Sequence, residues 1–306
     1  MKRILILGGT GFVGRHICTR LSQAGWSAIV PSRSPAAARH LAGLPRVDVV
    51  PGDVHDEATL IRLLAGADAV VNLVAILHGS EAAFEQVHVE LPKKLARACA
   101  AAGVRRLVQV SALGAALDGP SMYQRSKARG EAVLHTQAAA GILDLTVLRP
   151  SVIFGAQDKF LNVFAQLQRM FPLIPLAGAD TRFQPVWVED VAAAVMRCLQ
   201  DDATIGQTFE ACGPEVFTLR DLVRLAGQYA GVNQGRGRAV FALPMPLARV
   251  QAWVMERLPG EPLMSGDNLD SMAVDNVASG HLPGLAALGI TPAALADIAP
   301  GYLHRR

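Results

Sequence analysis

The sequence contains little that would indicate a membrane span, a disulfide framework or a nucleic-acid partner. No run of about 18 uninterrupted apolar residues occurs, so we predict no transmembrane helix. The four cysteines are scattered without a C-x-x-C pair, which favours reduced core thiols over disulfides or a metal site. The net charge of +3 is too small to indicate nucleic-acid binding. Because a strand pattern begins at residue 4, we expect no signal peptide and a cytoplasmic protein.

The sequence does contain a repeated alternation of apolar strand patterns and helical patterns. Hydrophobic residues make up 51% of the 306 residues, which is enough for a sizeable core. The alternation predicts an α/β fold with a doubly wound parallel sheet. We expect a Rossmann-type nucleotide-binding domain at 1–150, to which 184–210 returns, and a smaller α/β lobe built from 151–183 and 211–306. The predicted strands of the sheet are 4–7, 27–30, 47–50, 69–75, 106–110 and 145–150.

The first fifteen residues carry the strongest pattern. An apolar run at 4–7 is followed by the stretch GGTGFVG at 8–14 and then by a helical pattern. In such a unit Gly8 allows a tight turn, Gly11 lets the backbone approach a pyrophosphate, and Gly14 lets the helix pack on the strand. The N–H groups that open the helix attract an anion. We therefore predict dinucleotide binding here; the alternative is a turn that only packs. The further contacts expected in this turn are Thr10, Phe12 and Val13.

The spacing G-x-x-G-x-x-G resembles the signature of the extended and atypical short-chain dehydrogenase/reductase families. In these families an acidic residue after the third strand lies beside the adenine ring, which makes Asp53 and Val54 candidate adenine neighbours. Asp53 is also a candidate N-cap for a helix predicted at 57–65. The end of the fourth strand, with Val74 and Ala75, is expected to pass beneath the cofactor at the carboxyl edge of the sheet.

The segment after the second strand lacks a carboxylate. NAD-preferring sites place an acidic residue roughly 20 positions past the glycines to bind the ribose 2′-OH, whereas this chain has Arg33 in that region. A guanidinium can instead pair with a 2′-phosphate. We therefore predict NADP(H) in preference to NAD(H), with Arg15, Arg39 and His40 as additional positive charge. The alternative is that Arg33 is a solvated loop residue.

Tyr123 and Lys127 are four residues apart in a helical pattern and so share one helix face. A nearby ammonium and a cationic nicotinamide would favour the phenolate and lower the tyrosine pKa from about 10 towards neutrality. In proton transfer Tyr123 would be the acid/base, and Lys127 would activate it and hold the ribose hydroxyls. Ser111, at the end of the fifth strand, would hydrogen-bond a substrate carbonyl, although its gap to Tyr123 is shorter than is usual in the resembled families. The alternative is a trio that lines the cofactor without turnover.

Two later segments resemble motifs of the extended reductases. The run RPSVIFG at 149–155 is similar to R-P-x-x-x-[FY]-G. That resemblance implies that backbone groups of Pro150, Val152 and Ile153 lie near the nicotinamide. The run PVWVEDV at 185–191 is similar to P-V-x-V-x-D-V, in which we expect Asp190 to cap a helix at 191–199.

The stretch 240–258 differs in character from the rest of the chain. Leu247, Val250, Val254 and Leu258 recur at helical spacing in a helix predicted at 248–258. We expect this helix to pack on the smaller lobe. The alternative is a surface for a membrane or a larger assembly.

The segment Asp275-Asn276-Val277 and the terminal pair Tyr302-Leu303 narrow the resemblance to one atypical group, which includes the NADPH-binding accessory subunit of mitochondrial respiratory complex I. This resemblance implies NADPH held as a structural or slow redox cofactor. It also implies a membrane-associated respiratory or quinone-biosynthesis complex as partner, and a peripheral position at the inner membrane. The alternative is an active NADP-dependent reductase or epimerase acting on a small carbonyl or a nucleotide-sugar. We expect neither a nucleic acid nor a metal ion as partner.

Overall fold

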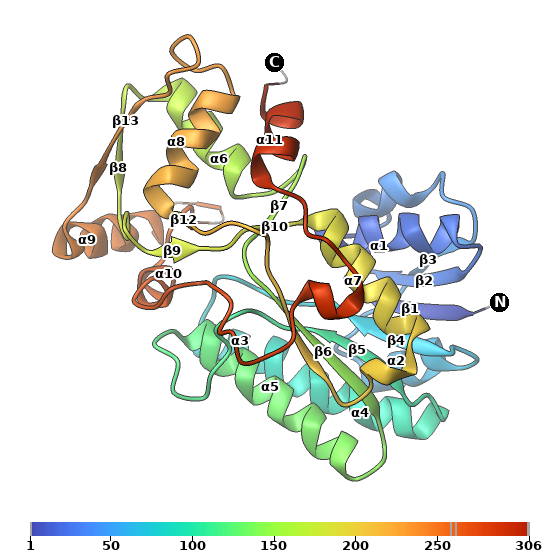
Figure 1. Cartoon of the computed structure of the whole chain (residues 1–306). Coiled ribbons are helices and arrows are strands. Elements are labelled where there is room, and N and C mark those ends of the chain that lie inside the picture. Colours follow the sequence, from blue (N-terminus) through green and yellow to red (C-terminus); the bar gives the residue numbers. More distant parts are fainter. Residues whose placement is uncertain (1, 258, 261, 305–306) are drawn as a thin grey trace.

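The computed structural model describes residues 2–257, 259–260 and 262–304. Within these residues seven strands form one sheet in the order β11-β6-β5-β4-β1-β2-β3, and every neighbouring pair runs parallel. Figure 1 shows the sheet in the lower part of the molecule and a second lobe at the upper left. The strand order reverses between β1 and β4, as it does in doubly wound sheets. The predicted fold class is confirmed.

The strands of this sheet are buried because their side chains are apolar on both faces. In β1, for example, the residues from Ile4 to Leu7 are fully buried. β4 ends earlier than predicted, at Asn72, so Val74 and Ala75 lie in the loop that follows it. The strand bounds are β1 (Arg3–Leu7), β2 (Ser27–Ser32), β3 (Val47–Pro51), β4 (Ala69–Asn72), β5 (Arg106–Val110), β6 (Asp144–Pro150) and β11 (Thr208–Ala211).

Helices cover both faces of the sheet (Figure 1). α1 (Phe12–Gln23) and α7 (Val188–Gln200) pack on one face, and α2 (Glu57–Leu64), α4 (Leu91–Ala102) and α5 (Met122–Ala139) pack on the other. α7 and β11 come from the segment that we predict to return to the nucleotide domain. Leu285 and Leu288, near the end of the chain, pack in the same core as α1 and α7. The domain boundaries themselves stay a prediction.

The helical segment between β4 and β5 is not uniform. α3 (Glu81–Glu85) follows Ser80, whose hydroxyl caps it; a π-helical turn spans Gln86–Glu90, and α4 continues from there. α5 crosses this turn at Gly130, where an added Cβ would lie 2.0 Å from the carbonyl oxygen of His88. The close approach therefore requires glycine at 130, and it places His88 against α5.

Two predicted helix caps are wrong. The N-cap of α2 is Asp56, whose carboxylate accepts a hydrogen bond from the Thr59 N–H (3.0 Å). Asp53 lies too far ahead of the helix and bonds within its own turn. Asp190 lies inside the first turn of α7 and accepts from the backbone N–H of Ala293 (2.8 Å). A side chain caps a helix from the residue directly before the first turn. α7 begins three residues earlier than predicted, whereas α2 begins at the predicted residue and Asp53 lies three residues ahead of the cap Asp56.

The second lobe is built around an apolar core in which α6, α8 and α11 meet, with Phe154 and Leu222 fully buried. Its described strands are short and pair outside the main sheet. The bounds in this lobe are β7 (Ile153–Phe154), α6 (Leu161–Met170), β8 (Leu173–Leu176), β9 (Arg182–Phe183), β10 (Val186–Trp187), β12 (Phe217–Thr218), α8 (Leu219–Tyr229), β13 (Ala239–Ala242), α9 (Met245–Met255), α10 (Gly266–Ser271) and α11 (Leu295–Leu303).

α9 packs on the smaller lobe through residues other than its apolar stripe. Its buried residues are Ala248 and Ala252, whereas Leu247, Val250 and Val254 are between 46% and 60% exposed. Leu258, the last residue of the predicted stripe, lies outside the described residues. The helix packs on the smaller lobe, as expected, but Ala248 and Ala252 make the contact, while Leu247, Val250 and Val254 of the stripe stay exposed.

The cysteine prediction is confirmed: Cys18, Cys99, Cys198 and Cys212 are buried free thiols. Burial raises the pKa of each thiol to about 12, so these groups are poor nucleophiles and poor metal ligands. No cluster of His, Cys, Asp and Glu that could hold a metal ion occurs among the described residues. The helices of the described ranges include none with the length and apolar character needed to cross a bilayer.

Candidate cofactor site

The glycine turn between β1 and α1 has the geometry that the sequence predicts. Gly8 has a φ of +82°, which favours glycine, and its carbonyl oxygen accepts from the Gly11 N–H (3.0 Å). A Cβ on Gly14 would lie 2.5 Å from the carbonyl oxygen of Gly8 and from Cα of Gly9, so the helix packs directly on the turn. Gly11 is the N-cap and supplies no side-chain hydrogen bond to α1. The start of α1 thus presents backbone N–H groups of the kind that favour an anion.

The other residues predicted in this turn lie close by. Phe12 and Val13 are half-buried, and Thr10 is half-buried at the tip of the turn. The ring of Phe12 lies next to Gly155, since a Cβ on that glycine would come within 3.2 Å of it. The turn after β1 and the segment after β7 therefore meet, which brings two predicted cofactor segments together.

Positive charge gathers where β2 ends. Arg33 and Arg39 are exposed after this strand, and no carboxylate occurs in 31–40. Desolvation, and then the charge of Arg15, lower the pKa of His40. Arg33 and Lys94 are among the groups that lower the pKa of His55, although burial is the larger cause. These shifts indicate that Arg15 lies near His40 and that Arg33 and Lys94 lie near His55, where Asp53 acts in the opposite direction.

The adenine side of the predicted site lies at the end of β3. Val54 packs against the core below α2, and Asp53 is exposed, with its carboxylate accepting from the His55 N–H (2.9 Å). Val74 is half-buried and Ala75 is exposed in the loop after β4. The placement of these four residues beside an adenine ring stays a prediction.

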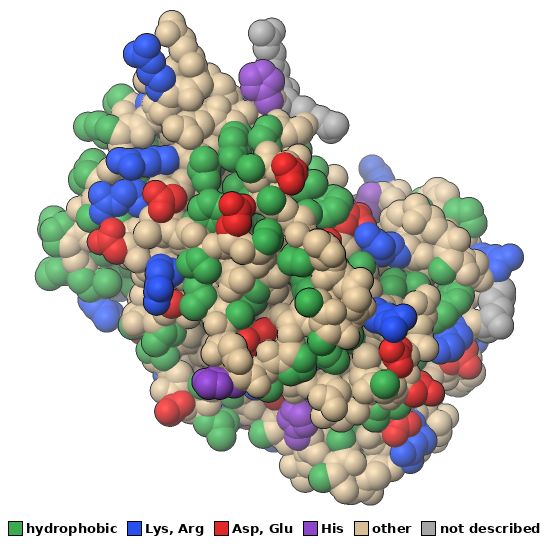
Figure 2. Space-filling view, viewed as in Figure 1, with side chains coloured by type: hydrophobic (Ala, Val, Ile, Leu, Met, Phe, Trp, Pro, Cys, Tyr) green, Lys and Arg blue, Asp and Glu red, His purple; other side chains and the backbone are tan. Residues whose placement is uncertain are grey.

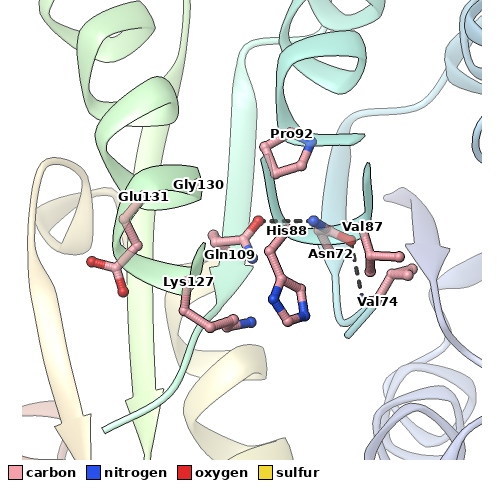
Figure 3. A pocket seen from close by; sticks show the side chains of 9 residues that line it. All are labelled: Asn72, Val74, Val87, His88, Pro92, Gln109, Lys127, Gly130 and Glu131. Carbon is pink, nitrogen blue, oxygen red and sulfur yellow. Dashed lines mark hydrogen bonds between the residues drawn. The ribbon is translucent and has the colours of Figure 1, made fainter. Parts of the chain in front are cut away.

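A small cavity lies at the carboxyl ends of β4 and β5 (Figure 3). Lys127 reaches towards it from α5 and His88 from the π-helical turn, and the two side chains lie beside each other. The amide of Asn72 donates to Oε1 of Gln109 (2.9 Å) across the neighbouring strands. The residues that line the cavity are Asn72, Val74, Val87, His88, Pro92, Gln109, Lys127, Gly130 and Glu131. The structure thus brings together Lys127 and Val74, which the sequence assigns to the cofactor.

The protonation of Tyr123 and Lys127 is governed by burial in the chain alone. Burial lowers the pKa of Lys127 to about 8, against a smaller opposite effect of Glu131, and its Nζ donates to the carbonyl oxygen of Val110 (3.1 Å). Burial raises the pKa of Tyr123 to about 12. In the chain alone desolvation outweighs any help from a lysine that is itself easily neutralised, so the tyrosine pKa is raised. The predicted lowering, which also requires the charge of a bound nicotinamide, stays a prediction.

His88 is a component of the site that the sequence analysis missed. Its Nε2 accepts from the Ile76 N–H (3.2 Å), which leaves the proton on Nδ1 to donate to Ser126 Oγ (2.8 Å). Ser126 in turn donates to the carbonyl oxygen of Tyr123 (2.9 Å), and the rings of His88 and Tyr123 meet edge to face. Burial, and then Lys127, lower the pKa of His88 to about 3, so it stays neutral. This histidine joins the loop after β4 to the helix that carries Tyr123.

Ser111 lies at the end of β5, where its N–H donates to the carbonyl oxygen of Leu148 in β6 (2.7 Å). Its hydroxyl is buried and has no hydrogen-bond partner in the described ranges. Burying a hydroxyl unpaired is unfavourable, so the observation points to a polar group that binds there.

The segment after β6 is held by Asn276, another residue that the sequence analysis did not assign to the site. Its side-chain oxygen accepts from the Ser151 hydroxyl (2.6 Å) and from the Val152 N–H (3.2 Å). Pro150 is buried, Val152 and Ile153 are half-buried, and the Pro150 carbonyl accepts from the N–H of Leu113 (2.9 Å). The segment is thus fixed next to the end of β5, which carries Ser111.

A residue of the second lobe caps the N-terminus of α5. The carboxylate of Asp267, in α10, accepts from the backbone N–H groups of Met122 (2.6 Å) and Tyr123 (3.1 Å). Ser121 adds a capping box with Gln124. A buried carboxylate at a helix N-terminus is favoured by the helix dipole. α10 therefore fixes the start of the helix that carries Tyr123 and Lys127.

These features fit a bound dinucleotide. The glycine turn offers backbone donors for a pyrophosphate, the arginines after β2 offer charge for a ribose phosphate, and Ser111 offers an unpaired hydroxyl. A nicotinamide cofactor, when bound, supplies hydride-transfer chemistry. The chain's own groups would bind and orient it: Lys127 is an ammonium donor, and Tyr123 is a proton donor at neutral pH.

Comparison with known proteins agrees with this geometry. Residues 4–212 match the family described as "NAD dependent epimerase/dehydratase family". The chain is 31% identical, over 300 residues, to NADH dehydrogenase (ubiquinone) 1 alpha subcomplex subunit 9, mitochondrial, of Mus musculus; the match covers 95% of this chain and 76% of that protein. The protein of the same name from Arabidopsis thaliana is 30% identical over 304 residues, covering 94% and 73%. The resemblance stated from the motifs is confirmed.

A solved structure supports the fold independently. The dTDP-glucose 4,6-dehydratase of Streptomyces venezuelae, determined with NAD bound, superposes with a TM-score of 0.77 at 21% identity, covering 98% of this chain and 95% of that chain. At this identity the likeness shows the fold alone. Together with the family match over more than half of the chain, the sheet and the glycine turn lead to one assignment. This chain belongs to the NAD dependent epimerase/dehydratase family.

Proposed function

We propose that this protein binds NADP(H) and holds it as a structural or slowly exchanging redox cofactor, in association with a membrane-bound respiratory or quinone-synthesising complex. The proposal that the cofactor is held rather than rapidly turned over rests on the protonation of Tyr123 and Lys127. Burial raises the pKa of Tyr123 to about 12 and lowers that of Lys127 to about 8, which opposes formation of a phenolate at neutral pH. Lys127 also donates to the Val110 carbonyl, so part of its donor capacity is already used. This arrangement favours holding a cofactor over rapid proton transfer.

The preference for NADP(H) rests on the segment after β2. Arg33 is exposed there, no carboxylate occurs in 31–40, and Arg15 adds charge nearby. A 2′-phosphate would gain charge-assisted hydrogen bonds from a guanidinium, whereas a 2′-hydroxyl has no carboxylate acceptor in this segment.

The proposed partner follows from the relatives. Two proteins that match more than nine tenths of this chain are named as mitochondrial subunits of NADH dehydrogenase (ubiquinone). We propose a corresponding peripheral position for this chain, beside a membrane-bound quinone-linked complex. The described helices, none of which could cross a bilayer, are compatible with attachment through a partner or a surface.

The cofactor preference is tested by titrating nucleotide-free protein with NADPH and with NADH. We expect Arg33→Asp to weaken NADPH binding by about 10- to 100-fold, the value of one or two charge-assisted contacts, and to leave NADH binding nearly unchanged. Arg62→Asp on α2 is the matched control, since it makes the same charge change on another surface. Equal losses for both nucleotides would contradict the assignment of Arg33.

One observation favours a second candidate, an active NADP-dependent reductase. The buried hydroxyl of Ser111 has no partner in the part of the chain that the structure describes, which is what a substrate carbonyl would require. In that case Tyr123→Phe would abolish turnover of a carbonyl or quinone substrate while NADPH binding is retained. Turnover that persists in this variant would remove Tyr123 from the chemistry.

A further inference from the structure

Asn276 lies where its own segment meets three others. Its side-chain oxygen accepts from the Ser151 hydroxyl (2.6 Å) and from the Val152 N–H (3.2 Å), and its side-chain nitrogen donates to the carbonyl oxygen of Leu113 (3.4 Å). Its backbone N–H donates to the carbonyl oxygen of Arg182 (2.8 Å). This one residue therefore ties the segments that follow β5 and β6 to β9.

The segment that contains Asn276 links the second lobe to the sheet. Figure 1 shows the chain leaving α10, descending to the sheet and then returning to α11. On the lobe side Asn276 forms a parallel bridge with Phe183 in β9. On the sheet side its amide reaches the segments after β5 and β6, which are neighbouring parallel strands. An amide suits this place, because it faces both a carbonyl oxygen and N–H or O–H donors.

The ends of β5 and β6 are where the second half of a dinucleotide would lie. In the proposed function the arginines after β2 bind the adenosine half, and the glycine turn after β1 binds the pyrophosphate. A ligand of a doubly wound sheet crosses the point where the strand order reverses, which here is between β1 and β4. The nicotinamide half is then expected over the ends of β4, β5 and β6, beside the buried hydroxyl of Ser111, which has no partner within the described ranges.

We propose that Asn276 is the positioning residue for the nicotinamide half of the cofactor. It fixes the backbone after β5 and β6 that faces this half, and it acts through those two segments. The inference rests on the proposed function, because it takes NADP(H) as the ligand of the site. It adds that the second lobe, through one side chain, sets the affinity of the site for the nicotinamide half and leaves the adenosine half unaffected.

Asp275 is a matched control in the neighbouring position. Its carboxylate accepts from the backbone N–H of Arg182 (2.8 Å) and pairs with the guanidinium of the same residue (2.7 Å). In the described part of the chain Asp275 thus joins its segment to β9, but not to the segments after β5 and β6. A general loosening of the lobe would affect variants of both residues, whereas misplacement of the nicotinamide half would affect only variants of Asn276.

The test compares two ligands on each variant by isothermal titration. NADPH contains both halves of the dinucleotide, whereas adenosine 2′,5′-bisphosphate contains the adenosine half with its 2′-phosphate and no nicotinamide. We expect Asn276→Ala to weaken NADPH binding by about tenfold, the value of one or two hydrogen bonds, and to change binding of the bisphosphate by less than about twofold. Asp275→Ala should leave the ratio of the two affinities as it is in the unchanged protein.

Ser151→Ala removes the hydrogen bond to Asn276 from the other side and leaves the remaining contacts of Asn276 in place. We expect it to weaken NADPH binding by about threefold, and we expect the double variant to bind no more weakly than Asn276→Ala alone. Circular dichroism and the melting temperature would check folding. If Asn276→Ala does not fold, the ligand ratio of Ser151→Ala decides, and an unchanged ratio overturns the proposal.

Equal losses for the two ligands in Asn276→Ala would overturn the proposal, because they would mean a general effect of the lobe. A ratio that Asp275→Ala changes as much as Asn276→Ala does, or an unchanged NADPH affinity in Asn276→Ala, would overturn it too. Each of these results leaves NADP(H) binding by the unchanged protein standing. Failure of the unchanged protein to bind NADPH would instead overturn the proposed function and this inference together.

Discussion

The carboxyl edge of the sheet and the outer side of α9 are incomplete in opposite ways. At the sheet edge the apolar side chains are buried, while polar groups stay available: the N–H groups that open α1, the arginines after β2 and the hydroxyl of Ser111. On the outer side of α9, which carries Val250 and Trp253, the apolar side chains are exposed, while a polar group such as Glu256 is paired within the protein. Figure 2 shows hydrophobic side chains along the left edge of the molecule, where Figure 1 places α9.

The two regions differ in how far each one specifies a ligand. Unpaired N–H donors at a glycine turn favour a small anionic ligand, because such a ligand can accept several of their hydrogen bonds at once. Exposed apolar side chains specify no such ligand, because apolar burial has no direction and scales with area. Asp267 connects the two regions, since α10 packs with α9 and caps the helix that carries Tyr123 and Lys127.

Of all the substitutions considered for the cofactor site, Gly14→Ala is expected to have the largest effect. The added Cβ would lie 2.5 Å from backbone atoms of Gly8 and Gly9, so the turn must shift away from its anion-binding geometry. We expect NADPH affinity to fall by about 100-fold or more and the unfolding free energy to fall by about 1–3 kcal/mol.

Gly43→Ala is the control for that substitution, because a Cβ there meets no atom within 4 Å. Isothermal titration and thermal unfolding of both variants would measure the two effects. A Gly14→Ala protein that binds NADPH normally would contradict the assignment of the turn.

The next largest effect concerns Lys127. We expect this side chain to lower the stability of the fold and to support NADPH binding. Its pKa falls from 10.5 in the unfolded chain to about 8 in the fold, so the buried charge destabilises the fold below pH 8. This destabilisation is relieved as the pH rises from about 8 to about 10.5, because the folded lysine is then neutral while the unfolded one is still charged.

Lys127→Met should therefore be more stable than the unchanged protein at pH 7, by on the order of 3 kcal/mol at most, and the difference should shrink towards pH 10. Its NADPH affinity should fall by about tenfold, the value of one lost charged hydrogen bond. Urea unfolding at several pH values checks the first statement and nucleotide titration the second. A stability difference that grows with pH would reverse the sign and contradict the buried-charge account.

The smallest effect concerns the link between the two regions. Asp267→Asn keeps the shape but removes the charge that faces the N-terminus of α5, and it should cost about 1 kcal/mol of stability. Asp180→Asn, on an exposed carboxylate that pairs with Arg220, is the control and should change stability by less than about 0.5 kcal/mol. Equal effects of the two substitutions would mean that the contact of Asp267 with the N-terminus of α5 contributes nothing to stability.

The sheet and the glycine turn could be predicted because their determinants are local. An apolar run followed by glycines at fixed spacing specifies a strand, a turn and a helix, and the order of the strands follows from repeating that unit. Tyr123 and Lys127 could be placed on one helix face for the same reason.

The remaining features depend on contacts between distant segments. His88 lies in the π-helical turn with nothing nearby in sequence to mark it, and its role depends on Ile76 and Ser126. Asn276 reaches Ser151 across 125 positions, and Asp267 reaches Met122 across 145. The pKa values of Tyr123 and Lys127 depend on burial, which the spacing of the two residues does not contain. The sequence also does not indicate which side of α9 is buried, because both sides carry apolar residues.

The measurement that tests the central claim most directly is the identity and exchange rate of the nucleotide that copurifies with the protein. Mass spectrometry would identify it, and dilution into isotopically labelled NADPH would time its release. The account predicts NADP(H) that remains bound for hours. NAD(H) in the site, or NADP(H) that leaves within seconds, would contradict it.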